Sequence, residues 1–139
     1  MPQKTSDFFI KVNEITDRDG RYPVEAYEFV NDAVVYTVEK LSKKNSSGRN
    51  HITGQELLDG VKELGIKLYG PMASQVFQEW SIKDGMSVGN IVYNMVNCQL
   101  LRTSDSDSIS DFNIPLDFQK ALTSPFMPKW KKMSEYKID

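Results

Sequence analysis

Hydrophobic residues recur at helical spacing through most of the chain, most regularly between residues 51 and 82. A helix begins there at Thr53, which can act as N-cap, and Glu56 three residues later completes a capping box. The apolar positions of this helix follow at intervals of three or four residues: Leu57, Val61, Leu64 and Leu68. After Gly70 and Pro71 a second helix has its own apolar positions, Met72, Val76, Phe77 and Trp80. Such stripes are buried in folded proteins, so we expect this pair of helices to organise the core.

Three further helices are expected around the central pair. The first, over residues 5–19, has a narrow apolar stripe and should dock at the edge of the domain. The second, over 23–41, is apolar across a broad face, which favours a central position, and a polar loop follows it over 42–50. The last, over 87–100, begins at the N-cap Ser87 and has no charged side chain. A helix of that composition should be largely enclosed.

The periodicity changes after residue 100. Apolar and polar positions alternate at Phe112, Ile114 and Leu116, and the polar stretch SDSDS precedes them. This pattern predicts a small β-hairpin, with Pro115 placing its second arm at an edge. Together with the two helices before it, the hairpin would make residues 71–116 resemble a winged helix. The fold class expected is therefore mainly α: one five-helix domain over 1–122 with a small C-terminal β-hairpin, followed by an extended or disordered tail over 123–139.

Composition narrows the class of protein only slightly. The chain has 139 residues, 40% of them hydrophobic and 26% charged, which is typical of one globular domain. A net charge of −2 does not by itself indicate a polyionic partner. No apolar run reaches the length of a membrane span, and the first residues, MPQKTSDFF, lack the apolar core of a signal peptide. With a single cysteine as well, we expect a cytoplasmic protein without a membrane partner.

The sequence contains no catalytic or cofactor signature. Neither glycine-rich phosphate motif occurs, His51 is the only histidine, and Cys98 lies in a charge-free helix where an inert, buried thiol is expected. The acidic group Asp105, Asp107 and Asp111 lacks the glycine and glutamate that an EF-hand loop needs at its sixth and twelfth positions. We therefore predict no catalytic residue, no metal site and no cofactor, and leave open whether the protein is an enzyme.

Two groups of residues remain as candidates for binding. Cationic side chains precede the N-terminus of the helix at Thr53, where backbone donors favour an anion: Lys43, Lys44, Arg49 and His51. A simple solvated basic loop is the favoured interpretation, because short runs of charge usually have no other role. Polar or cationic side chains that could meet a partner or a nucleic acid lie on the last helix and in the tail: Asn90, Asn94, Asn97, Lys129, Trp130, Lys131 and Lys132. Affinity for duplex DNA comes chiefly from cations that contact phosphates. The wing would be acidic, so duplex binding is disfavoured.

Three blocks of the sequence suggest a family. RYPVEAYEFV, HITGQELL and YGPMA, together with the following GNIVYNMVNCQLL, resemble successive blocks of a small family of uncharacterised bacterial proteins. The similarity covers roughly residues 21–118. It implies a bacterial cytosolic protein of unknown function and assigns no catalytic residue.

Three functional hypotheses follow. The first is a non-enzymatic module that presents a face to an unknown protein partner or to a second copy of itself. The second is a nucleic-acid-associated protein that uses the winged-helix-like half or the basic tail. The third is a small-anion binder or enzyme at the loop over residues 43–51.

Overall fold

The computed structural model describes residues 5–45, 51–104 and 107–127, and these residues are mainly helical. The α-helices in this part of the chain are α1 (Ser6–Arg18), α2 (Val24–Asn45), α3 (Gly54–Tyr69), α4 (Ala73–Glu79), α5 (Gly85–Asn97) and α6 (Phe118–Thr123). Short 3-10 turns connect or extend them: η1 (Gly70–Met72), η2 (Ile109–Phe112) and η3 (Ser124–Phe126). The mainly helical class predicted from the periodicity is confirmed.

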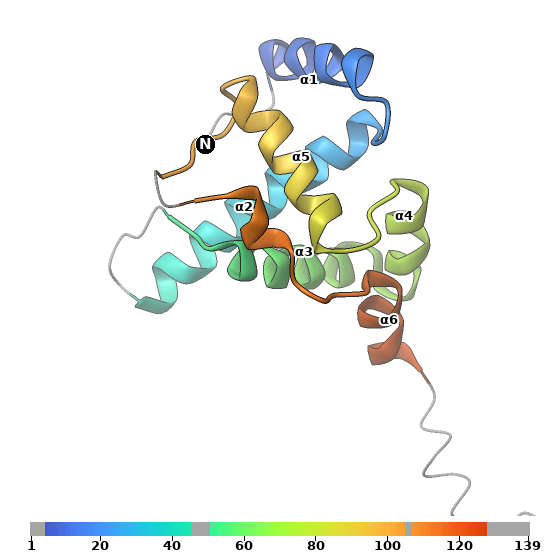
Figure 1. Ribbon diagram of the computed structural model, residues 1–139. Helices are drawn as coiled ribbons and strands as arrows, with labels where there is room; N and C mark the ends of the chain where they lie inside the picture. Colours follow the sequence, from blue (N-terminus) through green and yellow to red (C-terminus); the bar gives the residue numbers. More distant parts are fainter. Residues whose placement is uncertain (1–4, 46–50, 105–106, 128–139) are drawn as a thin grey trace, which may run out of the picture.

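The helices pack around α2 and α3, which contact each other over much of their length (Figure 1). α5 contacts both of them, and α1 covers α2 and α5 at one end of the protein. At the other end α4 and α6 pack together beside α3. None of the helices in the described ranges combines the length and apolar composition needed to cross a bilayer.

The start of α3 is built as its sequence predicts. The Thr53 hydroxyl accepts a hydrogen bond from the backbone N–H of Glu56, and the Glu56 carboxylate accepts one from the N–H of Thr53. The apolar stripe that follows is buried at Leu57 and Val61, the latter with no exposed area. Leu68 is wrongly predicted, because it is 55% exposed at the end of α3, where no neighbouring element covers it fully.

A cluster of aromatic rings packs at the end of the protein where α4 and α6 lie. Phe77 of α4 has no exposed area, and its ring meets those of Phe29 in α2, Trp80 and Phe118 in α6. The ring centroids of Phe77 lie 5.3 Å from those of both Phe29 and Phe118. Edge-on packing at such distances is favourable beyond the area it buries. This cluster fixes the short helices α4 and α6 against the long ones.

Two helix boundaries differ from the predicted ones. α5 begins two residues earlier than expected, because the carboxylate of Asp84 accepts the hydrogen bond from the N–H of Ser87 and is the N-cap. Ser87 lies inside the helix, where its hydroxyl donates to Asp84 and accepts from the N–H of Lys83. α2 continues to Asn45 instead of ending near Leu41, so it includes part of the segment that we expected to be a loop.

The β-hairpin expected after α5 is not found, and the residues described contain no strand. Ser108 and Asp111 form a capping box that starts the 3-10 turn η2, and an extended segment over 113–117 leads on to α6. Burial alternates along that segment, as the pattern predicted, but the segment lies on helices and pairs with no strand among the described residues. Period-2 alternation indicates which side chains face inward and does not specify what they pack against. Without the hairpin, the described residues contain no wing.

The tail is described only at its beginning. Residues 118–123 form α6, and residues 124–126, which were expected to belong to an extended or disordered tail, form η3. The remainder, 128–139, lies outside the described residues.

Candidate functional site

A cavity of about 620 Å³ lies between α2, the start of α3, α5 and the segments over 99–103 and 107–112. Its apolar wall comes from helices that are far apart in the sequence: Val34 and Val38 of α2, Leu57 of α3, Val92 of α5, and Leu100 and Leu101 after it. A volume of that size is within the range of sites for small organic molecules. The hydrophobic stripes of three helices therefore line a cavity as well as forming a core.

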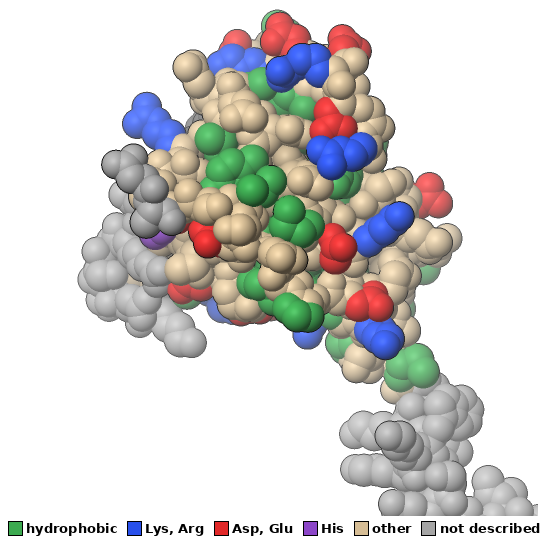
Figure 2. Space-filling model, in the orientation of Figure 1, with side chains coloured by type: hydrophobic (Ala, Val, Ile, Leu, Met, Phe, Trp, Pro, Cys, Tyr) green, Lys and Arg blue, Asp and Glu red, His purple; other side chains and the backbone are tan. Residues whose placement is uncertain are grey.

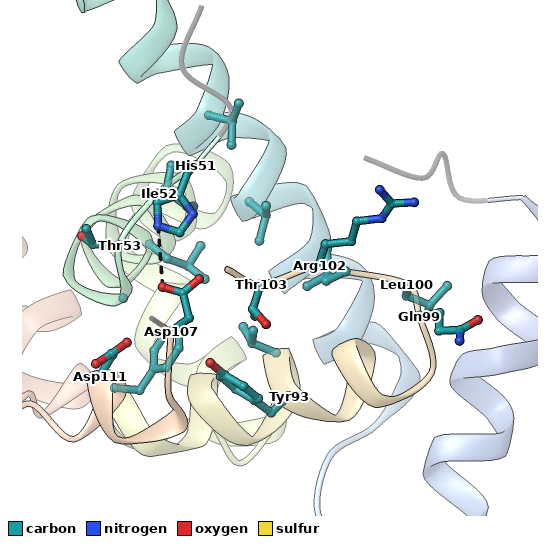
Figure 3. A pocket seen from close by; sticks show the side chains of 17 residues that line it. His51, Ile52, Thr53, Tyr93, Gln99, Leu100, Arg102, Thr103, Asp107 and Asp111 are labelled. Atoms are coloured by element: carbon teal, nitrogen blue, oxygen red, sulfur yellow. Dashed lines mark ion pairs between the residues drawn. The ribbon is translucent and has the colours of Figure 1, made fainter. Parts of the chain in front are cut away.

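Polar side chains occupy one edge of the cavity. His51 Nε2 lies 3.6 Å from Asp107 Oδ1, with Asp111, Thr103 and Tyr93 close by (Figure 3). The second oxygen of Asp107 accepts a hydrogen bond of 2.9 Å from the N–H of Ser104. The cavity therefore combines apolar walls with one edge at which two carboxylates, an imidazole and two hydroxyls face a ligand.

Tyr93 shows that both carboxylates act on the interior of the cavity. Its pKa is raised above the ordinary value, first by burial and then by the negative charges of Asp107 and Asp111. The phenol is protonated at neutral pH, so its hydroxyl can donate a hydrogen bond as well as accept one. The ring itself is held edge-on by Phe112, at a centroid distance of 6.4 Å.

The wall that carries Asp111 is held close to α5 by two glycines. A β-carbon at Gly89 would lie 2.8 Å from the β-carbon of Phe112, and one at Gly85 would overlap the carbonyl oxygen of Phe112. Phe112 is consequently packed directly on the helix, with 6% of its surface exposed. Close approach of backbone to helix is a common reason for glycine at such positions. The packing of Phe112 on α5 thus fixes the position of its neighbour Asp111 relative to Tyr93.

The proposed anion-binding group is only partly brought to this site. His51 lies at the edge of the cavity, with its side chain 51% exposed. Lys43 lies on the last turn of α2, as does Lys44, whose side chain is outside what the structure describes. Arg49 also lies outside the described residues. Of the cavity's polar residues, the sequence alone pointed to His51 as a binding residue, and the aspartates were considered for calcium and as acidic residues of a wing.

The asparagines of α5 have different surroundings from those we expected. Asn90 donates a hydrogen bond of 3.1 Å to the Tyr22 hydroxyl, and Asn94 donates to Tyr27 at 3.0 Å and to Asp19 at 3.1 Å. Both are partly buried and connect α5 to α2 and to the turn before it, whereas Asn97 is exposed. Two of the three residues thus have a structural role, which spacing along one helix could not reveal.

Cys98 also differs from its prediction. The thiol is partly exposed, and its sulfur accepts a hydrogen bond of 3.3 Å from the guanidinium of Arg18 in α1. The tail residues Lys129, Trp130, Lys131 and Lys132 lie outside the described residues. In the part of the chain that is described, no group of three or more histidine, cysteine or acidic side chains is arranged to hold a metal ion.

Fold and cavity together define a mainly helical protein with a cavity of small-molecule size at the side of its core. No protein-family model matches the chain, and neither the curated proteins nor the solved structures include a significant match. The resemblance to an uncharacterised bacterial family therefore stays a prediction.

Proposed function

We propose that this protein binds a small organic molecule with an apolar body in the cavity between α2, α3, α5 and residues 99–103 and 107–112. The observation that carries the proposal is the combination of valine and leucine walls with a polar edge around Asp107. Apolar walls supply affinity and a few polar groups fix orientation in most small-molecule sites. The proposal includes no catalytic step. It places His51 at the edge of the cavity instead of in an anion-binding basic loop.

Binding is tested directly on the unaltered protein by nuclear magnetic resonance with neutral probes, hexanol and benzyl alcohol. We expect saturable shifts of backbone amide signals at lining residues such as Val38, Leu57 and Val92, and none at Phe77 on the far side of α3. Glycerol, which has no apolar body, should cause no saturable shift. Absence of saturable shifts with both alcohols, or shifts centred on Phe77, would contradict the proposal.

A cavity-filling variant adds an independent test. Val38→Phe places a larger side chain in the cavity and should weaken hexanol binding at least about tenfold, since the ring takes the volume that the probe needs. The matched control is Ile10→Phe, at an exposed position of α1 away from the cavity, which should bind hexanol as the unaltered protein does. Isothermal titration calorimetry measures both.

A second candidate function is self-association through the outer face of α5. From Gly85 to Leu101 the chain has no charged side chain, and Figure 2 shows uncharged and hydrophobic side chains over the centre of this face, with charged ones around it. In a two-fold contact the same surface meets itself, so an uncharged surface avoids the like-charge repulsion that a charged one would suffer. In this candidate function the protein forms a homodimer, and its interaction partner is a second copy of the same chain.

A further inference from the structure

We infer that the ligand of the cavity carries a positively charged amine at one end of its apolar body. The inference rests on the proposed binding function and adds the chemistry of the ligand's polar end. It concerns the edge of the cavity formed by Asp107, Asp111, Tyr93 and Thr103 (Figure 3).

The two carboxylates have acceptor capacity that the protein does not use. Asp111 accepts a hydrogen bond from the N–H of Ser108 through Oδ2, and its Oδ1 has no hydrogen-bond partner in the described part of the chain. Asp107 faces His51 only at 3.6 Å, which is longer than a hydrogen bond. Each ionised carboxylate can accept several hydrogen bonds and has none to donate. An ammonium group, with three donors and a positive charge, complements them.

The negative charge of these carboxylates reaches the space that a ligand would occupy. Burial raises the pKa of Tyr93 most, and both carboxylates raise it further; Tyr93 is one of the residues that line the cavity. A group that opposes removal of a proton from a phenol equally opposes an anion placed beside that phenol. The same field favours a cation. The cavity therefore selects against carboxylates, sulfates and phosphates at this edge.

The cationic groups that the structure describes beside the cavity do not reverse this preference. Arg102 contributes to the lining, but its guanidinium points away from Asp107 and Asp111 (Figure 3). The His51 side chain lies 3.6 Å from Asp107 Oδ1 and is 51% exposed to solvent, where interactions between groups are screened. The anion preference predicted for His51 from the sequence is replaced by a preference for a cation.

Three probes of matched length separate this inference from the proposed function: hexylamine, hexanol and hexanoate. Calorimetry at neutral pH and low salt should rank hexylamine about tenfold tighter than hexanol, with hexanoate weakest, and added salt should reduce the advantage of the amine. If none of the three binds, the proposed function fails. If hexanol binds and hexylamine binds no more tightly, binding stands and the amine is wrong.

Isosteric variants locate the preference. Asp111→Asn and Asp107→Asn keep the shape and the hydrogen bonds accepted from Ser108 and Ser104, and should each remove most of the advantage of hexylamine over hexanol. Asp117→Asn is the control, because the Asp117 carboxylate also accepts backbone hydrogen bonds, as the N-cap of α6, and lies outside the cavity. Unchanged hexanol affinity shows that a variant retains the cavity. An amine advantage that survives in both cavity variants would overturn the inference, as would its loss in Asp117→Asn.

Discussion

At the scale of single residues, the polar contacts that matter most connect α5 to the turn between α1 and α2. Asp19 is held from two sides, by the Arg21 guanidinium at 2.7 Å and by the amide of Asn94 at 3.1 Å. Asn94 in turn reaches the hydroxyl of Tyr27, a residue with no exposed area. Partly buried polar groups of this kind specify one arrangement of helices, because leaving any of them unpaired is costly.

The hydrogen bonds to Asp19 predict a pH dependence of stability. Its pKa is held well below the usual range, chiefly by the hydrogen bond from Arg21. A depressed pKa in the folded state stabilises the protein above the unfolded pKa of about 4, and that contribution is lost as the pH falls towards the folded value. Asp19→Asn should therefore lower the free energy of unfolding by about 1 kcal/mol at neutral pH, and by progressively less below about pH 4.

Urea unfolding at a series of pH values measures this difference. The control is Asp17→Asn, an exposed carboxylate two residues earlier with no hydrogen bond to any described residue, which should show no comparable trend. A cost of Asp19→Asn that stays constant from neutral pH down to about pH 3 would contradict the linkage.

At the scale of elements, α3 and α1 begin in different ways although both have a threonine at the N-cap. Thr53 accepts a hydrogen bond from the N–H of Glu56, whereas Thr5 makes no side-chain capping bond. The chain thus provides the same residue type in the same position with and without the interaction. Only the first satisfies a backbone donor that the helix end would otherwise leave unpaired.

This contrast predicts unequal costs of the same substitution. Thr53→Ala should lower the free energy of unfolding by about 1 kcal/mol, the usual value of an N-cap, while Thr5→Ala should change it by only a few tenths. Chemical denaturation of the two variants under identical conditions measures both. Equal costs would mean that the capping box of α3 contributes nothing beyond threonine itself.

At the scale of the whole molecule, an uncharged surface on α5 coexists with charged surfaces around it. Met86, Asn90 and Asn97 recur on one face of α5 at spacings of four and seven residues, and Asn97 is exposed. The side-chain amide of Asn90 already donates a hydrogen bond to Tyr22. A partner on this face would therefore meet mainly its shape and its apolar area and fewer free hydrogen-bonding groups. These properties are those of a surface that meets a copy of itself.

Self-association predicts a molar mass that rises towards twice the monomer value with concentration. Asn97→Lys should return the protein to a monomer, because the introduced charges would face each other across the two-fold axis. Gln75→Lys, at an exposed position of α4, is the matched control and should leave the mass unchanged. Light scattering after size-exclusion chromatography measures the mass. A monomer at every concentration of the unaltered protein would contradict the second candidate function.

Prediction from the sequence succeeded where the determining interactions are local. The capping box at Thr53, the stop at Gly70 and the buried stripe of Leu57 and Val61 depend on residues within about one helical turn of each other. Prediction from the sequence failed where the outcome depended on which of several residues or elements pack against each other. Ser87 was predicted to cap α5, whereas Asp84 is the cap, and Phe112 was predicted to lie in a strand, whereas it lies in a turn that packs on glycines.

The sequence by itself determined that the protein is mainly helical, roughly where its helices lie and which of their faces are apolar, since those properties follow from capping and periodicity over a few residues. Only the tertiary structure decided that His51 lies beside Asp107, that Asn94 is committed to Asp19, and that three apolar stripes leave a cavity between them. These contacts depend on how the helices pack. No local pattern encodes them, because the residues concerned are separated by long stretches of chain and owe their proximity to the common core.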